Sequence, residues 1–149
     1  MASEPVVKEL FIDAPPEVVF EFFTDPGKMV QWLGIAAQLE PRPGGLFRVD
    51  PTGKDARCGT FLEVVPHSRI VFTWGWERQG GLVPAGGSRV EVDLRPSGSG
   101  THLRLVHSRL PENAREEHSG GWDHRLGRLK TVAEGRDPGV DPCADPSGR

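Results

Sequence analysis

The chain lacks tyrosine altogether, has only two cysteines, and carries no excess of basic residues. Cys58 and Cys143 are too few for a disulfide framework and too far apart for a zinc knuckle. The 18 Lys and Arg face 21 Asp and Glu, for a formal net charge of −3. This balance gives no electrostatic case for nucleic acid or for an anionic membrane surface. The composition, 36% hydrophobic and 26% charged, also argues against a membrane span.

The first residues of the sequence contain neither a basic segment nor an apolar run, so we expect no signal peptide. We therefore expect a cytoplasmic protein in which both thiols are free. No cofactor and no metal site are expected.

What the sequence does contain is turn formers: 19 glycines and 14 prolines among 149 residues. This content favours many short elements over a helical bundle. The length suits one domain, which we expect to span residues 1–135. Residues 136–149 hold Asp-Pro pairs at every fourth position, so they can be neither helix nor central strand. We expect them to form an extended tail.

The apolar pattern alternates with period two over most of the chain. Val6 to Ile12 predicts a first strand. Two short helices should follow, one from Pro15 to Phe23 and one capped by Asp25 with Pro26 in its first turn. Further strands are predicted over residues 35–40, 46–49, 59–65, 69–77, 89–95 and 101–109. The glycine-rich stretch 79–88 is expected to be a hairpin loop, with a lid over the interior as a weaker alternative.

The last predicted element is a helix. Trp122, Leu126, Leu129 and Ala133 recur at helical spacing and form one apolar stripe. Residues 111–118 are either its first turns or a separate short helix, because Gly120-Gly121 weakens the middle. Helices segregated from a run of antiparallel strands predict an α+β fold.

Several short motifs occur in a fixed order along the chain. They are Ala14 to Phe20 (APPEVVF), Asp25-Pro26 with Trp32, Pro43 to Arg48 (PGGLFR), Glu63 to Pro66 (EVVP), Thr73-Trp74, Gly100-Thr101 and Gly121-Trp122. Together, over Val6 to Glu134, they resemble the activator-of-heat-shock-protein-90-ATPase-like family of the START/birch-pollen-allergen-like (SRPBCC) superfamily.

The resemblance implies a helix-grip fold, in which a curved antiparallel sheet of six or seven strands wraps around the long C-terminal helix. It also implies a hydrophobic cavity between sheet and helix. Members of the superfamily bind lipids, sterols, polyketides or plant hormones, a few catalyse cyclisation, and the founding chaperone activators stimulate an ATPase.

Aromatic residues are the main candidates for the cavity wall, with ordinary core packing as the alternative. The predicted ligand-binding residues are Trp32, Phe47, Phe72, Trp74, Trp76, His107, Trp122 and Leu126. His107 is a polar group on the otherwise apolar face of Leu103 and Leu105. It could form a hydrogen bond to a ligand or act as a general base. The alternative is a histidine whose hydrogen bonds are made to the backbone or to water.

Two other polar groupings are weaker. Glu63 could pair with His107 only if it faces inward, and the sequence leaves the inward face of residues 59–65 open, because a shift of one residue exchanges the faces. His118, Asp123 and His124 resemble metal ligands in the sequence, but the two histidines would lie on nearly opposite faces of a helix.

Three functions are compatible with these observations. A soluble protein that binds a small hydrophobic molecule has the most support. A chaperone-associated protein-interaction domain, with a protein partner or as a homodimer, is the alternative. A cyclase- or hydrolase-type enzyme is the second alternative; it would need Glu63 or His107 in the cavity, and catalysis has less support than binding.

Overall fold

The computed structural model of the chain describes residues 4–50, 56–77 and 83–139. Cys143, most of the tail and much of the 79–88 loop lie outside these ranges. The elements in chain order are β1 (Val6–Ile12), α1 (Pro16–Thr24), α2 (Pro26–Met29), β2 (Ala36–Leu39), β3 (Leu46–Asp50), β4 (Arg57–Val65), β5 (Arg69–Trp74), β6 (Ser88–Ser97), β7 (Gly100–Ser108) and α3 (Glu112–Ala133). The predicted α+β class is confirmed.

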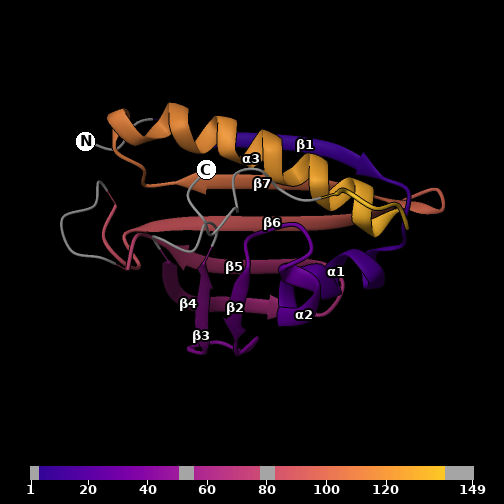
Figure 1. The fold of residues 1–149 in the computed structure, drawn as a ribbon, viewed down its shortest axis with the longest axis horizontal. Helices are drawn as coiled ribbons and strands as arrows, with labels where there is room; N and C mark the ends of the chain where they lie inside the picture. The colour runs from indigo at the N-terminus through magenta and orange to yellow at the C-terminus, as the bar shows by residue number, and fades with distance from the viewer. Residues whose placement is uncertain (1–3, 51–55, 78–82, 140–149) are drawn as a thin grey trace.

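The strands form one antiparallel sheet of seven strands in the order β1-β7-β6-β5-β4-β3-β2. β2 and β3 run across the direction of β6 and β7, so the sheet is strongly bent (Figure 1). α3 lies along the face of the β1–β7 side, and α1 and α2 lie beside its C-terminal half (Figure 1). This is the helix-grip arrangement.

The two longest strands, β6 and β7, show why the sheet has one buried face. Val90, Val92 and Leu94 alternate with half-exposed charged residues along β6. On β7, Leu103, Leu105 and His107 are all fully buried. Val90 pairs with His107 across the two strands. The inward face predicted for β7 is therefore confirmed.

The two short helices begin as their sequence predicts. Pro16 is the first residue of α1, where its missing N–H costs nothing. Asp25 caps α2, its carboxylate accepting a hydrogen bond of 2.8 Å from the Gly27 amide. The chain leaves this region at Gly34, whose φ of +94° favours glycine.

α3 is one continuous helix of 22 residues that includes Gly120 and Gly121. The alternative of a separate short helix is thereby excluded. Its buried stripe is Ala114, His118, Trp122, Leu126, Leu129 and Ala133, so the predicted stripe extends two turns further toward the N-terminus. Packing against the sheet offsets the low helix propensity of the two glycines.

The interior under β3, β4 and β5 is a compact group of aromatic rings, which we call the phenylalanine cluster: Phe47, Phe61 and Phe72. All three side chains are at most 1% exposed. Phe47 stacks on Phe72 with ring centroids 4.0 Å apart and meets Phe61 edge-on at 5.5 Å. This cluster closes one end of the interior.

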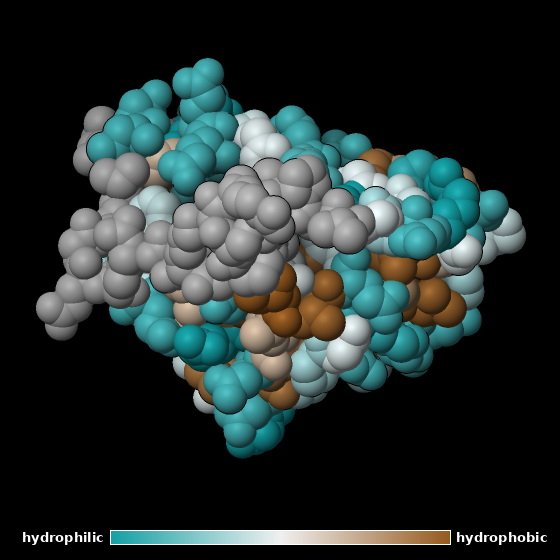
Figure 2. All heavy atoms as spheres, viewed as in Figure 1, coloured by the Kyte–Doolittle hydropathy of each residue, from teal (hydrophilic) through white to brown (hydrophobic). Residues whose placement is uncertain are grey.

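The face of the molecule shown in Figure 2 is mainly polar where its residues are coloured. On the face shown in Figure 2, apolar side chains reach the surface in small separate groups among hydrophilic ones. No helix within the described ranges is both long and apolar enough to cross a bilayer.

Candidate functional site: a cavity between the C-terminal helix and the sheet

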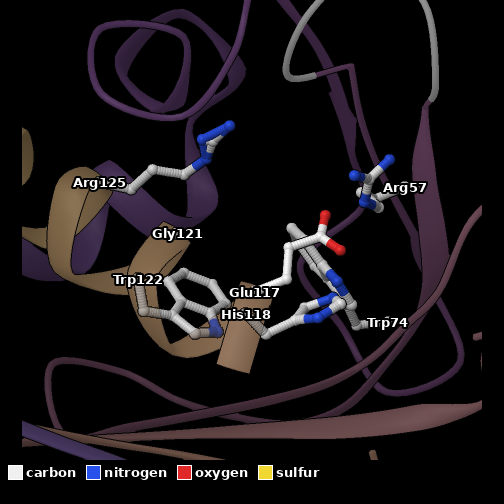
Figure 3. A pocket seen from close by; sticks show the side chains of 7 residues that line it. All are labelled: Arg57, Trp74, Glu117, His118, Gly121, Trp122 and Arg125. Carbon is white, nitrogen blue, oxygen red and sulfur yellow. The ribbon is translucent and has the colours of Figure 1, made fainter. Parts of the chain in front are cut away.

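A cavity of about 140 Å³ lies between the N-terminal half of α3 and the sheet. α3 supplies side chains from two successive turns, β5 supplies its last residue, and β4 its first (Figure 3). The lining residues are Arg57, Trp74, Glu117, His118, Gly121, Trp122 and Arg125. Pockets for drug-sized molecules are larger, about 300–1,000 Å³, so this space suits a single small ring.

Two indoles form the apolar part of the cavity wall. Trp74 of β5 and Trp122 of α3 have ring centroids 5.5 Å apart and planes tilted by 45°. They are 4% and 3% exposed. The residue directly after Trp74 and the end of β5 is Gly75, where a Cβ would lie 1.7 Å from the Pro84 carbonyl oxygen. Only glycine allows this close approach of the backbone.

His107 holds Trp122 in place. The Trp122 indole N–H donates to His107 Nδ1 at 2.9 Å, and His107 Nε2 lies 2.7 Å from Ser88 Oγ. An indole N–H can only donate, so Nδ1 carries a lone pair and the imidazole proton is on Nε2. Ser88 then accepts from Nε2 and donates its own hydrogen to the Trp74 carbonyl oxygen at 2.7 Å.

Every hydrogen bond in this chain therefore has a fixed direction. Burial, with a smaller contribution from the neighbouring His118, lowers the pKa of His107 to about 3. His107 is neutral at physiological pH, and protein groups occupy both of its ring nitrogens. Within this structure it orients an indole of the cavity wall, and it has no nitrogen available as a general base.

His118 lies one helical turn before Trp122 and lines the cavity directly. Its Nδ1 is 2.8 Å from the Ala114 carbonyl oxygen. A carbonyl only accepts, so Nδ1 carries the proton and Nε2 is an acceptor in the neutral ring. Burial lowers the pKa of His118, which favours that neutral form. Its ring meets His107 edge-on at 5.2 Å.

Trp74 is the exception among these satisfied groups. Its indole N–H is buried and has no hydrogen-bond acceptor among the described residues. Trp32, by contrast, donates to the Phe22 carbonyl oxygen at 2.9 Å. Buried donors without an acceptor are rare in folded proteins and call for an explanation.

Charged side chains line the remainder of the cavity. Arg57 comes from β4, and Glu117 and Arg125 come from α3. The three project into the space above the indoles in Figure 3. The Arg57 guanidinium also lies over the Trp76 ring, 4.9 Å from its centroid, a cation–π contact that fixes its stem. With both histidines neutral, the lining carries one net positive charge.

The structure distributes the predicted ligand-binding residues unevenly. Trp74 and Trp122 lie on the cavity wall, and His107 supports Trp122 from behind. Trp76 contacts His118 edge-on at 5.9 Å. The other four predicted residues are buried without lining this cavity: Trp32, Phe47, Phe72 and Leu126.

The open question about Glu63 is settled by an irregularity in β4. The register of β4 against β5 shifts between Phe61 and Glu63, so that Phe61 faces the core and Glu63 does not. The Glu63 carboxylate instead lies 3.2 Å from the Arg69 guanidinium. No Glu63–His107 pair is formed.

Five lining residues were not predicted from the sequence: Arg57, Glu117, His118, Gly121 and Arg125. For two of them a signal was present. His118 is four residues before Trp122, and Arg125 is three residues after it, so helical spacing places all three on one side of α3. The interruption expected at Gly120-Gly121 concealed this periodicity. Arg57 depends on strand pairing across the sheet and has no local signal.

Within the described ranges, no group of three or more His, Cys, Asp or Glu side chains is arranged to hold a metal ion. Cys58, on β4, is partly buried, and burial raises its thiol pKa. A raised thiol pKa lowers the reactivity of the cysteine.

The bent antiparallel sheet, the long C-terminal helix and the cavity between them define a helix-grip protein of the SRPBCC superfamily. The family model of Activator of Hsp90 ATPase homolog 1-like protein matches residues 13–134. The chain belongs to this family, which confirms the resemblance seen in the sequence.

Solved structures agree with this assignment. An AHSA1-like protein from Rhizobium etli, solved by NMR in solution, is 45% identical, with a TM-score of 0.74 over 95% of this chain and 92% of that one. DynU16, a protein in the dynemicin biosynthetic locus, is 25% identical, with a TM-score of 0.79 over 93% of this chain and 51% of that one.

An HSP90 activator from Plasmodium falciparum shares the fold at 22% identity, with a TM-score of 0.74 over 87% of this chain and 96% of that one. No curated protein matches the chain.

Proposed function

We propose that this protein binds a small, mainly apolar molecule between α3 and the sheet. The observation that carries the proposal is the cavity of about 140 Å³ walled by Trp74 and Trp122. An engineered cavity of about 150 Å³ admits benzene, so the space is sufficient for one six-membered ring. A larger ligand would extend outward past Arg57 and Arg125.

The surroundings of the cavity support binding over catalysis. His107 has both ring nitrogens engaged by protein groups, and Glu63 pairs with Arg69 outside the core. The enzyme hypothesis named these two residues, and neither is free for proton transfer to a bound molecule. The similarity to DynU16, a protein in the dynemicin biosynthetic locus, supports a role linked to small molecules.

Interaction with a chaperone is the second candidate, because the family is named for an activator of the Hsp90 ATPase. The fold shared with the Plasmodium falciparum activator supports it at the level of architecture. In that case the cavity would be incidental, and filling it would leave the interaction intact.

Two adjacent glycines of α3 provide a matched test. Gly121 lines the cavity and Gly120 is exposed, and an added Cβ meets no atom within 4 Å at either position. We expect Gly121→Leu to fill the cavity and Gly120→Leu to leave it open. Binding of 4-fluorotoluene, followed by ¹⁹F NMR, should weaken at least about tenfold in Gly121→Leu only, since the added side chain occupies the ring's space.

The outcome separates the candidates. Equal binding by both variants, or no binding by the unmodified protein up to the solubility limit of the probe, would contradict the proposal. A pull-down with an Hsp90-type ATPase that is unaffected by Gly121→Leu would then favour the chaperone alternative.

A further inference from the structure

The unpartnered indole N–H of Trp74 distinguishes this cavity from an ordinary apolar one. The Trp74 side chain is 96% buried, and its nitrogen has no acceptor among the residues that the structure describes. The corresponding N–H groups of Trp32 and Trp122 both have acceptors at 2.9 Å. A buried donor on a cavity wall is satisfied once a bound molecule brings an acceptor to it.

His118 adds the complementary group to the same cavity. Its Nδ1 proton is committed to the Ala114 carbonyl oxygen, so its Nε2 can only accept. Trp74 and His118 both line this cavity, and both are ring neighbours of His107 (Figure 3). The cavity thus offers one donor and one acceptor beside an apolar wall.

The remaining wall sets the shape of the ligand. Trp74 and Trp122 present two ring surfaces 5.5 Å apart at 45°, an arrangement that admits a third ring edge-on or offset. The volume of about 140 Å³ limits the enclosed part of the ligand to one six-membered ring.

We propose that the cavity selects an aromatic ring carrying a hydroxyl group. The hydroxyl oxygen accepts the hydrogen bond from Trp74 Nε1–H, and the hydroxyl hydrogen has His118 Nε2 as its acceptor. A hydroxyl is the simplest group that supplies both an acceptor and a donor at one atom. A carboxylate would satisfy Trp74 and leave the His118 lone pair without a hydrogen.

This inference rests on the proposed function and goes beyond it by naming the group that is recognised. It also gives Trp74 a role other than packing: its N–H determines specificity. Trp122, whose N–H is held by His107, contributes only its ring.

Three ring compounds of similar size test the proposal. 4-Fluorotoluene has no hydrogen-bonding substituent, 4-fluoroanisole has an ether oxygen that accepts only, and 4-fluorophenol has a hydroxyl. We expect 4-fluorophenol to bind about tenfold more tightly than 4-fluorotoluene, with 4-fluoroanisole between them, because each added hydrogen bond contributes separately. All three affinities are measured by ¹⁹F NMR.

The Trp74→Phe variant keeps an aromatic ring and removes the N–H. We expect the preference for 4-fluorophenol over 4-fluorotoluene to fall to that of the His118 contact alone, even if both bind more weakly. If the variant does not fold, the ¹H–¹⁵N indole resonances of the unmodified protein provide the second measurement. The Trp74 indole proton should shift downfield with 4-fluorophenol and much less with 4-fluorotoluene.

The inference would be overturned by equal affinities for the three compounds, or by a Trp74 indole resonance that shifts equally with 4-fluorophenol and 4-fluorotoluene. Either result would show that water alone satisfies this N–H. The proposed function would survive that result as long as Gly121→Leu still abolished binding. If none of the three compounds bound to the unmodified protein, both the inference and the proposed function would be overturned.

Discussion

The two ends of the interior contain similar side chains that are packed differently. At one end, the phenylalanine cluster is closed: Phe47 and Phe72 stack at 4.0 Å, and all three rings are buried. At the other end, Trp74 and Trp122 enclose a space of about 140 Å³ and are interleaved with two neutral histidines. Trp74 joins the two ends, since its ring also lies 6.0 Å from Phe47.

The phenylalanine cluster mainly stabilises the fold, whereas the cavity end is built for recognition. The phenylalanine cluster consists of apolar side chains and gains its stability from apolar burial. The cavity end keeps its rings apart by means of directed hydrogen bonds, from Trp122 through His107 and Ser88 to the Trp74 backbone.

Shortening a side chain of the phenylalanine cluster should reduce the free energy of unfolding most. Phe72→Ala removes the ring that stacks on Phe47 and leaves a cavity in a fully packed region. We expect a loss of about 3–5 kcal/mol in the free energy of unfolding, measured by denaturant melts. A loss below about 1 kcal/mol would mean that this end is not tightly packed.

At the cavity end, His107→Ala should cost about 2–3 kcal/mol, because it leaves the buried Trp122 N–H without an acceptor. The matched control is His102→Ala on the same strand. His102 is half-buried and pairs with the exposed carboxylate of Glu9 at 2.8 Å, so its loss should cost less than about 1 kcal/mol. Equal costs for the two variants would contradict the role given to the hydrogen-bonded chain.

Acid should destabilise the cavity end selectively. The folded state keeps His107 neutral because its pKa is lowered to about 3, while the unfolded state takes up a proton below its ordinary pKa of 6.5. The stability from this group is complete above pH 6.5 and falls as the pH drops toward 3. His118 acts in the same direction.

Between pH 7 and pH 5 we expect a loss of about 2 kcal/mol attributable to His107. Denaturant melts at pH 7, 6 and 5 measure it, and His107→Ala should show a correspondingly smaller loss. Identical pH profiles for this variant and the unmodified protein would refute the assignment.

The smallest effect is expected at the paired glycines. Gly120→Ala and Gly121→Ala should each raise the free energy of unfolding by about 0.5–1 kcal/mol, because alanine has the higher helix propensity and meets no neighbouring atom. Thermal melts should show both increases. Destabilisation by Gly121→Ala alone would indicate that the cavity is narrower than the structure shows.

Features that depend on residues close together in the sequence were predicted, and features that depend on contacts between distant segments were not. Local signals were sufficient for the first turn of α1, for the cap of α2, for the alternating faces of β6 and β7, and for the stripe on α3. They were insufficient at Glu63, because the register shift in β4 depends on pairing with β5. The apolar pattern within one strand does not determine which strand it pairs with or in which register.

The candidate site was predicted only in part for the same reason. Trp74 and Trp122 were identified by their size and position. The satisfaction of His107 by Trp122 and Ser88 depends on three elements meeting in space, and neither β6 nor α3 reveals it alone. His118 was accessible through its spacing from Trp122.

The central claim is that a ring binds between Trp74 and Trp122 while the part of the interior around Trp32, which does not line the cavity, does not respond. The most direct measurement is the ¹H–¹⁵N indole spectrum of the protein during a titration with 4-fluorophenol. We predict that the resonances of Trp74 and Trp122 move with a common affinity while that of Trp32, which donates to Phe22 away from the cavity, stays in place. A spectrum in which Trp32 moves and Trp74 does not, or in which no indole moves, would contradict the account.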